Sequence, residues 1–291
     1  MERRTHQGPI ARGNDVSSYA RRSVFYWLLL APLVIVILFP YAVMLSTALK
    51  PKAEILTFPP SWVGTELRWA NFVEMWSAVG FGQALLASVV VSTLATLACL
   101  VVAIPAAYAL ARLRFRGQGV YRQVLLVTQM LSPIVLVIGI FRLMAAMGLV
   151  DSAGALVLGY AAFNLAFAIW MLQSYFATIP RELEEAARID GASGLQSLVR
   201  VFLPLALPAL SVTGIFVFIY AWNEFVLALT LLRSPEKFTL PLKVFSLVGG
   251  AYRVDWEHVM AATFLASVPA AVVFSWLQRY LVRGLALGSV K

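Results

Sequence analysis

The feature that most constrains this chain is a series of six long apolar stretches. Each has about 20 or more residues, enough for a helix that rises about 1.5 Å per residue to cross a hydrocarbon core of roughly 30 Å. Hydrophobic residues make up 61% of the sequence and charged residues only 13%, which excludes an ordinary soluble domain. The six predicted spans are residues 24–49, 84–111, 120–144, 153–177, 205–232 and 259–282.

In hydrocarbon, every backbone N–H and C=O group needs a partner within the protein, so a chain crosses either as helices or as a closed barrel. The apolar stretches are too long and continuous for barrel strands. We therefore predict an all-α, polytopic membrane protein with a disordered tail at 1–22, a six-helix domain at 23–283 and a second tail at 284–291. Cys99 lies in an apolar stretch and is the only cysteine, so we interpret it as a packing residue.

Lys and Arg residues are divided unequally between the two sides of this predicted topology. The side of the N-terminus carries 15 of them and the other side carries eight. Because cytoplasmic segments hold the excess of positive charge, both termini are predicted to be cytoplasmic. The same asymmetry accounts for the net charge of +9 without a nucleic-acid partner.

The connection between the fourth and fifth predicted spans, residues 178–204, holds most of the polar information. Pro180 suits the first position of a helix and Gly191 the position past its end, so a short helix is predicted between them. Ser193 and Gln196 have the spacing of a capping box, which predicts a second helix. These features alone leave two readings open, a docking surface for another protein or a solvated connection. The second helix has a predicted apolar face made of Leu195, Leu198, Val199 and Phe202, and it ends at Pro204.

Motifs in this connection resemble those of a known family. Glu185-Ala186-Ala187, followed by Gly191 and then by Val201-Phe202-Leu203-Pro204, is similar to the EAA loop of permeases from binding-protein-dependent ABC importers, which often have Ile where this chain has Val201. Segments 45–51, 106–112 and 221–225 are similar to the maltose-type (MalG-like) carbohydrate permeases. The resemblance implies a type I ABC importer permease fold in a bacterial inner membrane, with a cytoplasmic coupling helix between the fourth and fifth spans.

The resemblance also implies partners. These are a second (MalF-like) permease, two copies of a cytoplasmic ATPase and an extracytoplasmic solute-binding protein. The sequence contains no Gly-x-x-x-x-Gly-Lys-Ser/Thr phosphate loop, so ATP and magnesium are expected on the ATPase, and this chain is expected to be no enzyme and to bind no cofactor or metal. By resemblance, the residues that couple to the ATPase are Glu184, Glu185, Ala186, Ala187, Asp190 and Gly191. The tail expected to project between the ATPase subunits is Gly288, Ser289, Val290 and Lys291.

Glu224 is the most costly residue of the predicted spans, because an ionisable group in hydrocarbon needs a partner, water or a proton. We predict that Trp222, Asn223 and Glu224 line the solute path, with the indole against a sugar ring and the polar groups on its hydroxyls. Asn164 and Gln129 are further candidates. The alternative role for Glu224 is a polar cluster that clamps its helix to a neighbour. A different class, an ion-gradient-driven transporter, would use Glu224 as a relay but leaves the EAA loop unexplained.

Two predicted extracytoplasmic segments carry further expectations. Trp62, Trp69 and Trp76 are typical of a belt at the membrane interface. The connection 233–258, which contains Gly249-Gly250, is expected by resemblance to meet the binding protein, and His258 is assigned no site. The solute could be a sugar, a polyol or a glycerol phosphate, because the partner permease and the binding protein share that choice.

Overall fold

The computed structural model describes residues 15–248 and 254–288, with side chains for residue 23 and for 25–248 and 254–276. These residues are mostly helical and include no strand, which confirms the all-α class. The α-helices are α1 (Asp15–Ala48), α2 (Ala70–Val79), α3 (Phe81–Arg112), α4 (Gln118–Met130), α5 (Pro133–Ala146), α6 (Ala153–Thr178), α7 (Arg181–Ile189), α8 (Gly194–Ser197), α9 (Leu203–Leu205), α10 (Leu207–Asn223), α11 (Val226–Leu231), α12 (Leu240–Ser246) and α13 (Trp256–Gly288).

Four helical segments in the described part of the chain are by themselves long and apolar enough to cross a membrane. They are Phe25–Ala48, Phe81–Arg112, Ala153–Thr178 and Trp256–Trp276. Two further crossings are possible if each of two bent helix pairs counts as one span, for a total of up to six. The six-span topology therefore stays a prediction, and the third and fifth spans are not the single helices that the apolar stretches suggest.

The third predicted span is broken near its middle. The axes of α4 and α5 meet at 101°, and the break lies at Leu131 and Ser132, whose ψ angles are 121° and 134°. Pro133 explains the break, because a proline disfavours helical backbone in the residue before it yet suits the first turn of the next helix.

The fifth predicted span is also divided. α10 ends at Asn223, Glu224 is extended with ψ at 129°, and α11 begins at Val226. At its other end, α10 meets the preceding helical segment Gly194–Leu205 at 82°. Glu224 thus lies at a helix break and not inside a continuous helix, which corrects the sequence-based interpretation.

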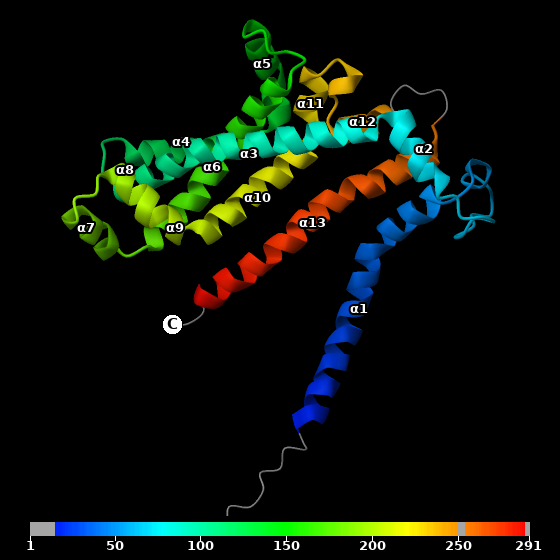
Figure 1. Ribbon diagram of the computed structural model, residues 1–291, viewed down its shortest axis with the longest axis horizontal. Coiled ribbons are helices and arrows are strands. Elements are labelled where there is room, and N and C mark those ends of the chain that lie inside the picture. Colours follow the sequence, from blue (N-terminus) through cyan, green and yellow to red (C-terminus); the bar gives the residue numbers. More distant parts are fainter. Residues whose placement is uncertain (1–14, 249–253, 289–291) are drawn as a thin grey trace, which may run out of the picture.

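The core is built around α3, which packs against α6 and α10 (Figure 1). Ala95, Cys99, Ala103 and Ala107 recur every fourth residue along α3 and are all buried. Small residues at this spacing lie on one helix face and let neighbouring backbones approach closely. Cys99 is a free, buried thiol in this stripe, as its apolar context predicted.

The first and last helices extend past the predicted domain limits. α1 begins at Asp15, so the predicted disordered tail is partly helical, and a carboxylate at a helix N-terminus favours such an extension. α13 continues to Gly288, beyond the predicted limit at 283. Figure 1 shows α1 diverging from the other long helices, and residues 25–47 of α1 include no buried residue, so its contacts within the chain are concentrated in its last turns, where Ala48 is buried.

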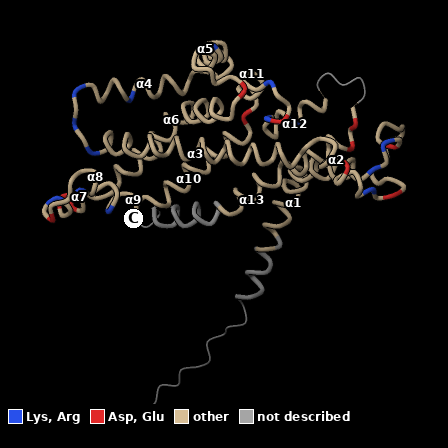
Figure 2. The backbone as a smooth tube through the Cα atoms, turned by 45° about the horizontal axis from the view of Figure 1, so that its top comes forward, with Lys and Arg blue, Asp and Glu red and all other residues tan. Residues whose placement is uncertain are grey.

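Charged residues gather at the two ends of the molecule and are sparse along the long helices (Figure 2). One end holds α7, where both signs occur, and the α3–α4 connection, where only Lys and Arg are seen; the other holds α2 and α12, where both signs occur. This separation is the pattern expected of a membrane protein whose charges stay near water. Which end faces the cytoplasm stays a prediction from the Lys and Arg counts.

Candidate coupling region and translocation cavity

The local structure of α7 follows its sequence closely. Pro180, predicted at the first helical position, is the N-cap, one position before the first helical residue Arg181, and Asp190 is the C-cap. Gly191 has φ at +82°, the left-handed conformation that ends a helix and that residues with a Cβ rarely adopt. Ser193 and Gln196 form both hydrogen bonds of the capping box. The predicted start and stop signals are thus confirmed, with Pro180 displaced by one residue.

The second helical segment differs from its predicted form. Residues 198–202 form a π-helical turn between α8 and α9, which widens the helix and changes the direction in which side chains point. Leu198 and Phe202 are buried, whereas Leu195 and Val199 are exposed. The single apolar face that the sequence predicts is therefore split in two.

Glu184 attaches α7 to the rest of the protein. Its side chain is buried, and its carboxylate accepts hydrogen bonds from the Tyr108 hydroxyl at 3.2 Å and from Arg188 at 2.6 Å. The guanidinium of Arg112, at the end of α3, lies 3.8 Å from the same carboxylate. Glu184 therefore faces the protein interior and is not part of the outer surface of α7.

Arg112 extends this attachment to α6. Its guanidinium donates hydrogen bonds to the carbonyls of Phe176, at 2.7 Å, and of Ile179, which close the last turn of α6. It also lies over the Phe202 ring, 4.7 Å from the centroid, a cation–π contact. One buried guanidinium thus links the ends of α3 and α6 to α7 and to the segment that follows it.

The outer surface of α7 holds most of the other predicted coupling residues. Glu185, Ala186, Asp190 and Gly191 are exposed and Ala187 is half-buried. Ile189, which sequence reasoning did not select, is 86% exposed beside them. Ile189 adds a large apolar side chain to the exposed surface that includes Ala186. Ile189 is the last residue of α7, directly before the predicted helix end, and this position in the sequence could have marked it as a candidate contact residue.

A cavity of about 790 Å³ opens where both broken helices are interrupted. Its wall includes the α4–α5 break, the centre of α6 and the α10–α11 break. Asn164, near the midpoint of α6, lies in this wall, so the cavity is at mid-depth of that helix. Irregular backbone within a membrane protein is tolerated where it lines a cavity or is buried in protein. The lining residues that carry polar groups are Thr128, Gln129, Ser132, Asn164, Tyr220, Asn223 and Glu224.

Four of the five predicted path residues meet in this cavity, namely Gln129, Asn164, Asn223 and Glu224. Trp222 does not. It is buried on another side of α10, where its ring stacks on Phe218 at 5.9 Å in the core cluster that joins α2, α3 and α13. Consecutive helix residues point about 100° apart, so Trp222 and Asn223 cannot face the same way.

The carboxylate of Glu224 has a structural partner. Its two oxygens accept hydrogen bonds from the backbone N–H of Leu227 at 3.0 and 3.1 Å, and one also accepts from Ala228 at 3.4 Å. This is the geometry of a side chain that caps the first turn of α11. The burial of a carboxylate at this depth is thereby compensated without an ion pair.

At the opposite end of the molecule, polar contacts fix two connections. Asp151, a non-glycine residue with φ at +61°, accepts hydrogen bonds from the backbone N–H of Arg233 and Ser234, at 2.9 and 3.0 Å, and an ion pair from Lys237 at 2.9 Å. The Ser234 hydroxyl also donates a hydrogen bond to this carboxylate, at 2.6 Å, and this bond, followed by those from Arg233 and Lys237, holds the pKa of the Asp151 carboxyl well below its usual range. Asp151 thus joins the α5–α6 connection to the segment after α11.

The predicted binding-protein connection and the predicted C-terminal tail lie partly outside the described residues. Gly249, Gly250 and Ser289 to Lys291 lie outside the described residues, and Gly288 is the last residue of α13. Within the described residues, no group of three or more His, Cys, Asp or Glu side chains could hold a metal ion.

Comparison with known proteins identifies the chain's relatives. The sequence profile of a family described as the inner membrane component of binding-protein-dependent transport systems matches residues 100–287, more than half of the chain. The chain belongs to this family. The diacetylchitobiose uptake permease DasC of Streptomyces coelicolor is 35% identical to this permease over 255 residues, covering 88% of the permease and 92% of DasC. The trehalose/maltose transport permease MalG of Thermococcus litoralis is 33% identical over 259 residues, again covering 88% and 92%.

A solved structure supports the same fold. A chain of a bacterial ABC transporter that imports the acidic polysaccharide alginate matches the permease with a TM-score of 0.75 and 24% identity, covering 94% of the permease and 99% of that chain. The permease is thus a membrane subunit of an ABC sugar importer with the type I importer fold, as the EAA resemblance predicted. This assignment replaces the alternative of an ion-gradient-driven transporter.

Proposed function

We propose that the cavity at the two helix breaks is this subunit's part of the solute path and that the solute is an uncharged saccharide. The observation that supports the proposal is the lining. Five aromatic residues and several amide or hydroxyl groups surround the cavity, and its described wall contains no Lys, Arg or His. The aromatic residues are Phe163, Phe167, Phe216, Tyr220 and Phe225.

The polar groups of this wall suit hydroxyl groups. The side-chain N–H groups of Asn164 and Asn223 each donate one hydrogen bond within their own helix, to Tyr160 and Ile219 at 2.8 Å. Each amide retains a second N–H and a carbonyl oxygen, so it can both donate to and accept from a sugar hydroxyl. Glu224, the only charged side chain in the described wall, would repel an anion, and the described wall holds no cation to attract one.

The path requires a second half from another chain, which we infer to be a related permease. Residues 25–47 of α1 include no buried residue within this chain, and the cavity is partly open to its surroundings. Membrane helices commonly bury such faces against a partner helix. A periplasmic protein carrying an alginate pentasaccharide is bound in a second structure of the alginate transporter, whose matching chain has a TM-score of 0.64, and this supports an extracytoplasmic solute-binding partner here.

Coupling to ATP hydrolysis is assigned to the outer surface of α7. We propose that Glu185, Ala186, Ala187, Asp190 and Gly191 contact a cytoplasmic ATPase, which binds ATP and magnesium, and that two ATPase copies serve the two permeases. Glu184 holds α7 to α3 and α6 through Arg112. A displacement of α7 would therefore move α3 and α6 with it as one rigid body. Glu184 therefore acts as a positioning residue within the coupling region.

The experiment is uptake into vesicles that contain the reconstituted importer. Asn164→Leu and Gln129→Leu should lower the uptake of trehalose, maltose or diacetylchitobiose, whichever the importer accepts, while Ser211→Ala, a half-buried position on α10 outside the cavity, should not. Unchanged uptake by both cavity variants would remove the cavity from the path. Uptake of alginate oligosaccharides, with none of the neutral sugars, would refute the uncharged class and leave the path assignment standing.

A further inference from the structure

The connection between α1 and α2 presents an unusual surface. Residues 55–63 contain no charged side chain, and four large apolar residues there point outward. Phe58 is 95% exposed and Leu56 is 82% exposed. We call this surface the apolar tip; its members are Leu56, Phe58, Trp62 and Val63.

The polar groups around the apolar tip are turned toward the protein. The Ser61 carbonyl accepts a hydrogen bond from the Lys50 ammonium, and the Trp62 carbonyl accepts one from the Ser46 hydroxyl of α1. Glu54 accepts hydrogen bonds from the backbone N–H of Thr65, at 3.0 Å, and from its hydroxyl. A water-exposed loop usually has the opposite arrangement, with its polar groups outward and its apolar groups buried.

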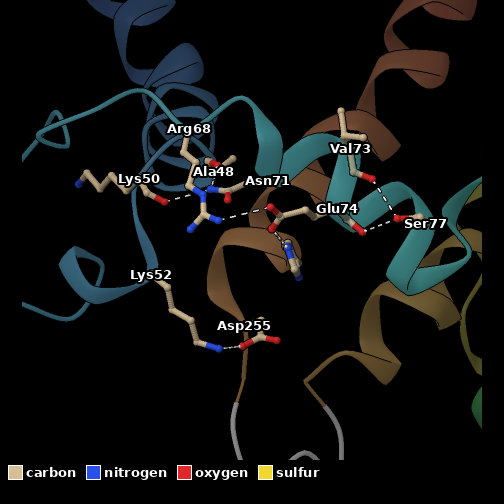
Figure 3. A network of polar contacts seen from close by, with 10 residues as sticks. Ala48, Lys50, Lys52, Arg68, Asn71, Val73, Glu74, Ser77 and Asp255 are labelled. Atoms are coloured by element: carbon tan, nitrogen blue, oxygen red, sulfur yellow. Dashed lines mark hydrogen bonds and ion pairs between the residues drawn. The ribbon is translucent and has the colours of Figure 1, made fainter.

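A buried polar network fixes the base of the connection. Asn71 of α2 is buried, and its side-chain N–H groups donate to the carbonyls of Ala48 at 2.8 Å and Lys50 at 3.0 Å (Figure 3). Lys52 forms an ion pair with Asp255 before α13 (Figure 3). The connection is therefore held to α1, α2 and the start of α13, and the apolar tip is presented by a defined scaffold.

The tip lies beside the apolar part of α1. The Trp62 carbonyl is hydrogen-bonded to the Ser46 hydroxyl, near the end of α1. The Trp62 ring packs on the Phe39 ring, with the ring centroids 5.8 Å apart. Phe39 precedes the end of α1 by nine residues, roughly 13 Å along the helix. The chain thus turns back along the apolar window Phe25–Ala48, and whatever solvates that end of α1 also surrounds the tip.

We propose that the apolar tip is a lipid anchor, inserted into the interfacial region of the leaflet at the α2 end of the molecule. That leaflet is the outer one in the predicted orientation. Indole rings at this depth are typical of the aromatic belt of membrane proteins. The uncharged tip, its inward polar groups and its position along α1 favour lipid over a binding protein, whose contacts at the membrane surface are partly polar. The anchor is independent of the proposed solute path.

Spin labelling tests the anchor, because Cys99 is the only cysteine and can be replaced. In a Cys99→Ala background, Phe58→Cys and Leu56→Cys each carry a nitroxide, and Glu66→Cys, an exposed position in the later part of the same connection, is the matched control. The full chain, copurified with the subunits it assembles with, is placed in bilayers of phosphatidylethanolamine and phosphatidylglycerol. Collision with oxygen reports lipid, and collision with a nickel chelate reports water.

The anchor predicts that both tip labels have a several-fold higher ratio of oxygen to nickel accessibility than the Glu66 label. A tip ratio equal to that of the control would show that the tip stands in water and would overturn the proposal. Low accessibility of the tip to both probes would also overturn it, because the tip would then be covered by protein.

Discussion

The buried carboxylate of Glu184 is the contact whose removal should act most strongly on coupling. Glu184→Ala leaves the Arg112 guanidinium, whose side chain is 4% exposed, without its counter-charge. Breaking a buried ion pair in this way costs about 3–5 kcal/mol. Arg112 keeps its hydrogen bonds to two α6 carbonyls, and Arg188 is largely exposed, so we expect about 3 kcal/mol, at the low end of that range.

This cost should be visible as local opening of α7. A loss of about 3 kcal/mol raises the open fraction roughly a hundredfold, because each 1.4 kcal/mol is a factor of ten. Trypsin reports it directly, since Arg181 and Arg188 lie in α7. Glu182→Ala, an exposed neighbour in the same first turn, is the control and should stay near the wild-type cleavage rate.

A double-mutant cycle identifies the partner. If Arg112 and Glu184 act as a pair, Arg112→Ala combined with Glu184→Ala should open α7 less than the sum of the single changes, by about 1 kcal/mol or more. Additive effects, or cleavage of Glu184→Ala at the Glu182→Ala rate, would refute the reasoning. ATPase copurified with the Glu184→Ala permease should hydrolyse ATP with less solute moved per ATP.

Further variants test the helix end, the docking surface, the cap and the acid response. Gly191→Val should strain the φ of +82° by about 1 kcal/mol and weaken coupling, whereas Gly194→Ala, with open space around its Cβ position, should not; uptake per ATP measures this. Ala187→Trp should leave insertion intact but reduce copurification of the ATPase. Glu224→Ala should remove the cap of α11, worth about 1 kcal/mol, and slow solute uptake. Glu224→Gln should restore part of the uptake, and equal uptake by the wild type and both variants would contradict the role of the cap. Because the pKa of Asp151 is lowered in the folded protein, the carboxylate stabilises the fold above the ordinary carboxyl pKa of about 4, and this stabilisation is lost as the pH falls through the lower pKa of the folded state. Asp151→Asn should therefore make stability less dependent on pH at the acid end, as measured by thermal unfolding across a pH series.

Local features were predictable from the sequence because they depend on neighbouring residues. Long apolar stretches specify a helical membrane protein, since no other element but a closed barrel satisfies the backbone in hydrocarbon. The left-handed Gly191 and the Ser193–Gln196 capping box also follow from side-chain chemistry within one or two turns. The EAA motif supplied the family for the same reason, as a short pattern of residue types.

Only the tertiary structure decided which way each side chain faces. Hydropathy marks residues 205–232 as one stretch, yet the chain breaks at Glu224, because the Glu224 carboxylate caps a new helix there. Trp222 and Asn223 are adjacent in sequence but enter a core cluster and a cavity, respectively, and Glu184 turns inward beside the exposed Glu185. Such choices depend on how each helix is rotated against its neighbours, and that rotation is set by packing between segments far apart in the chain.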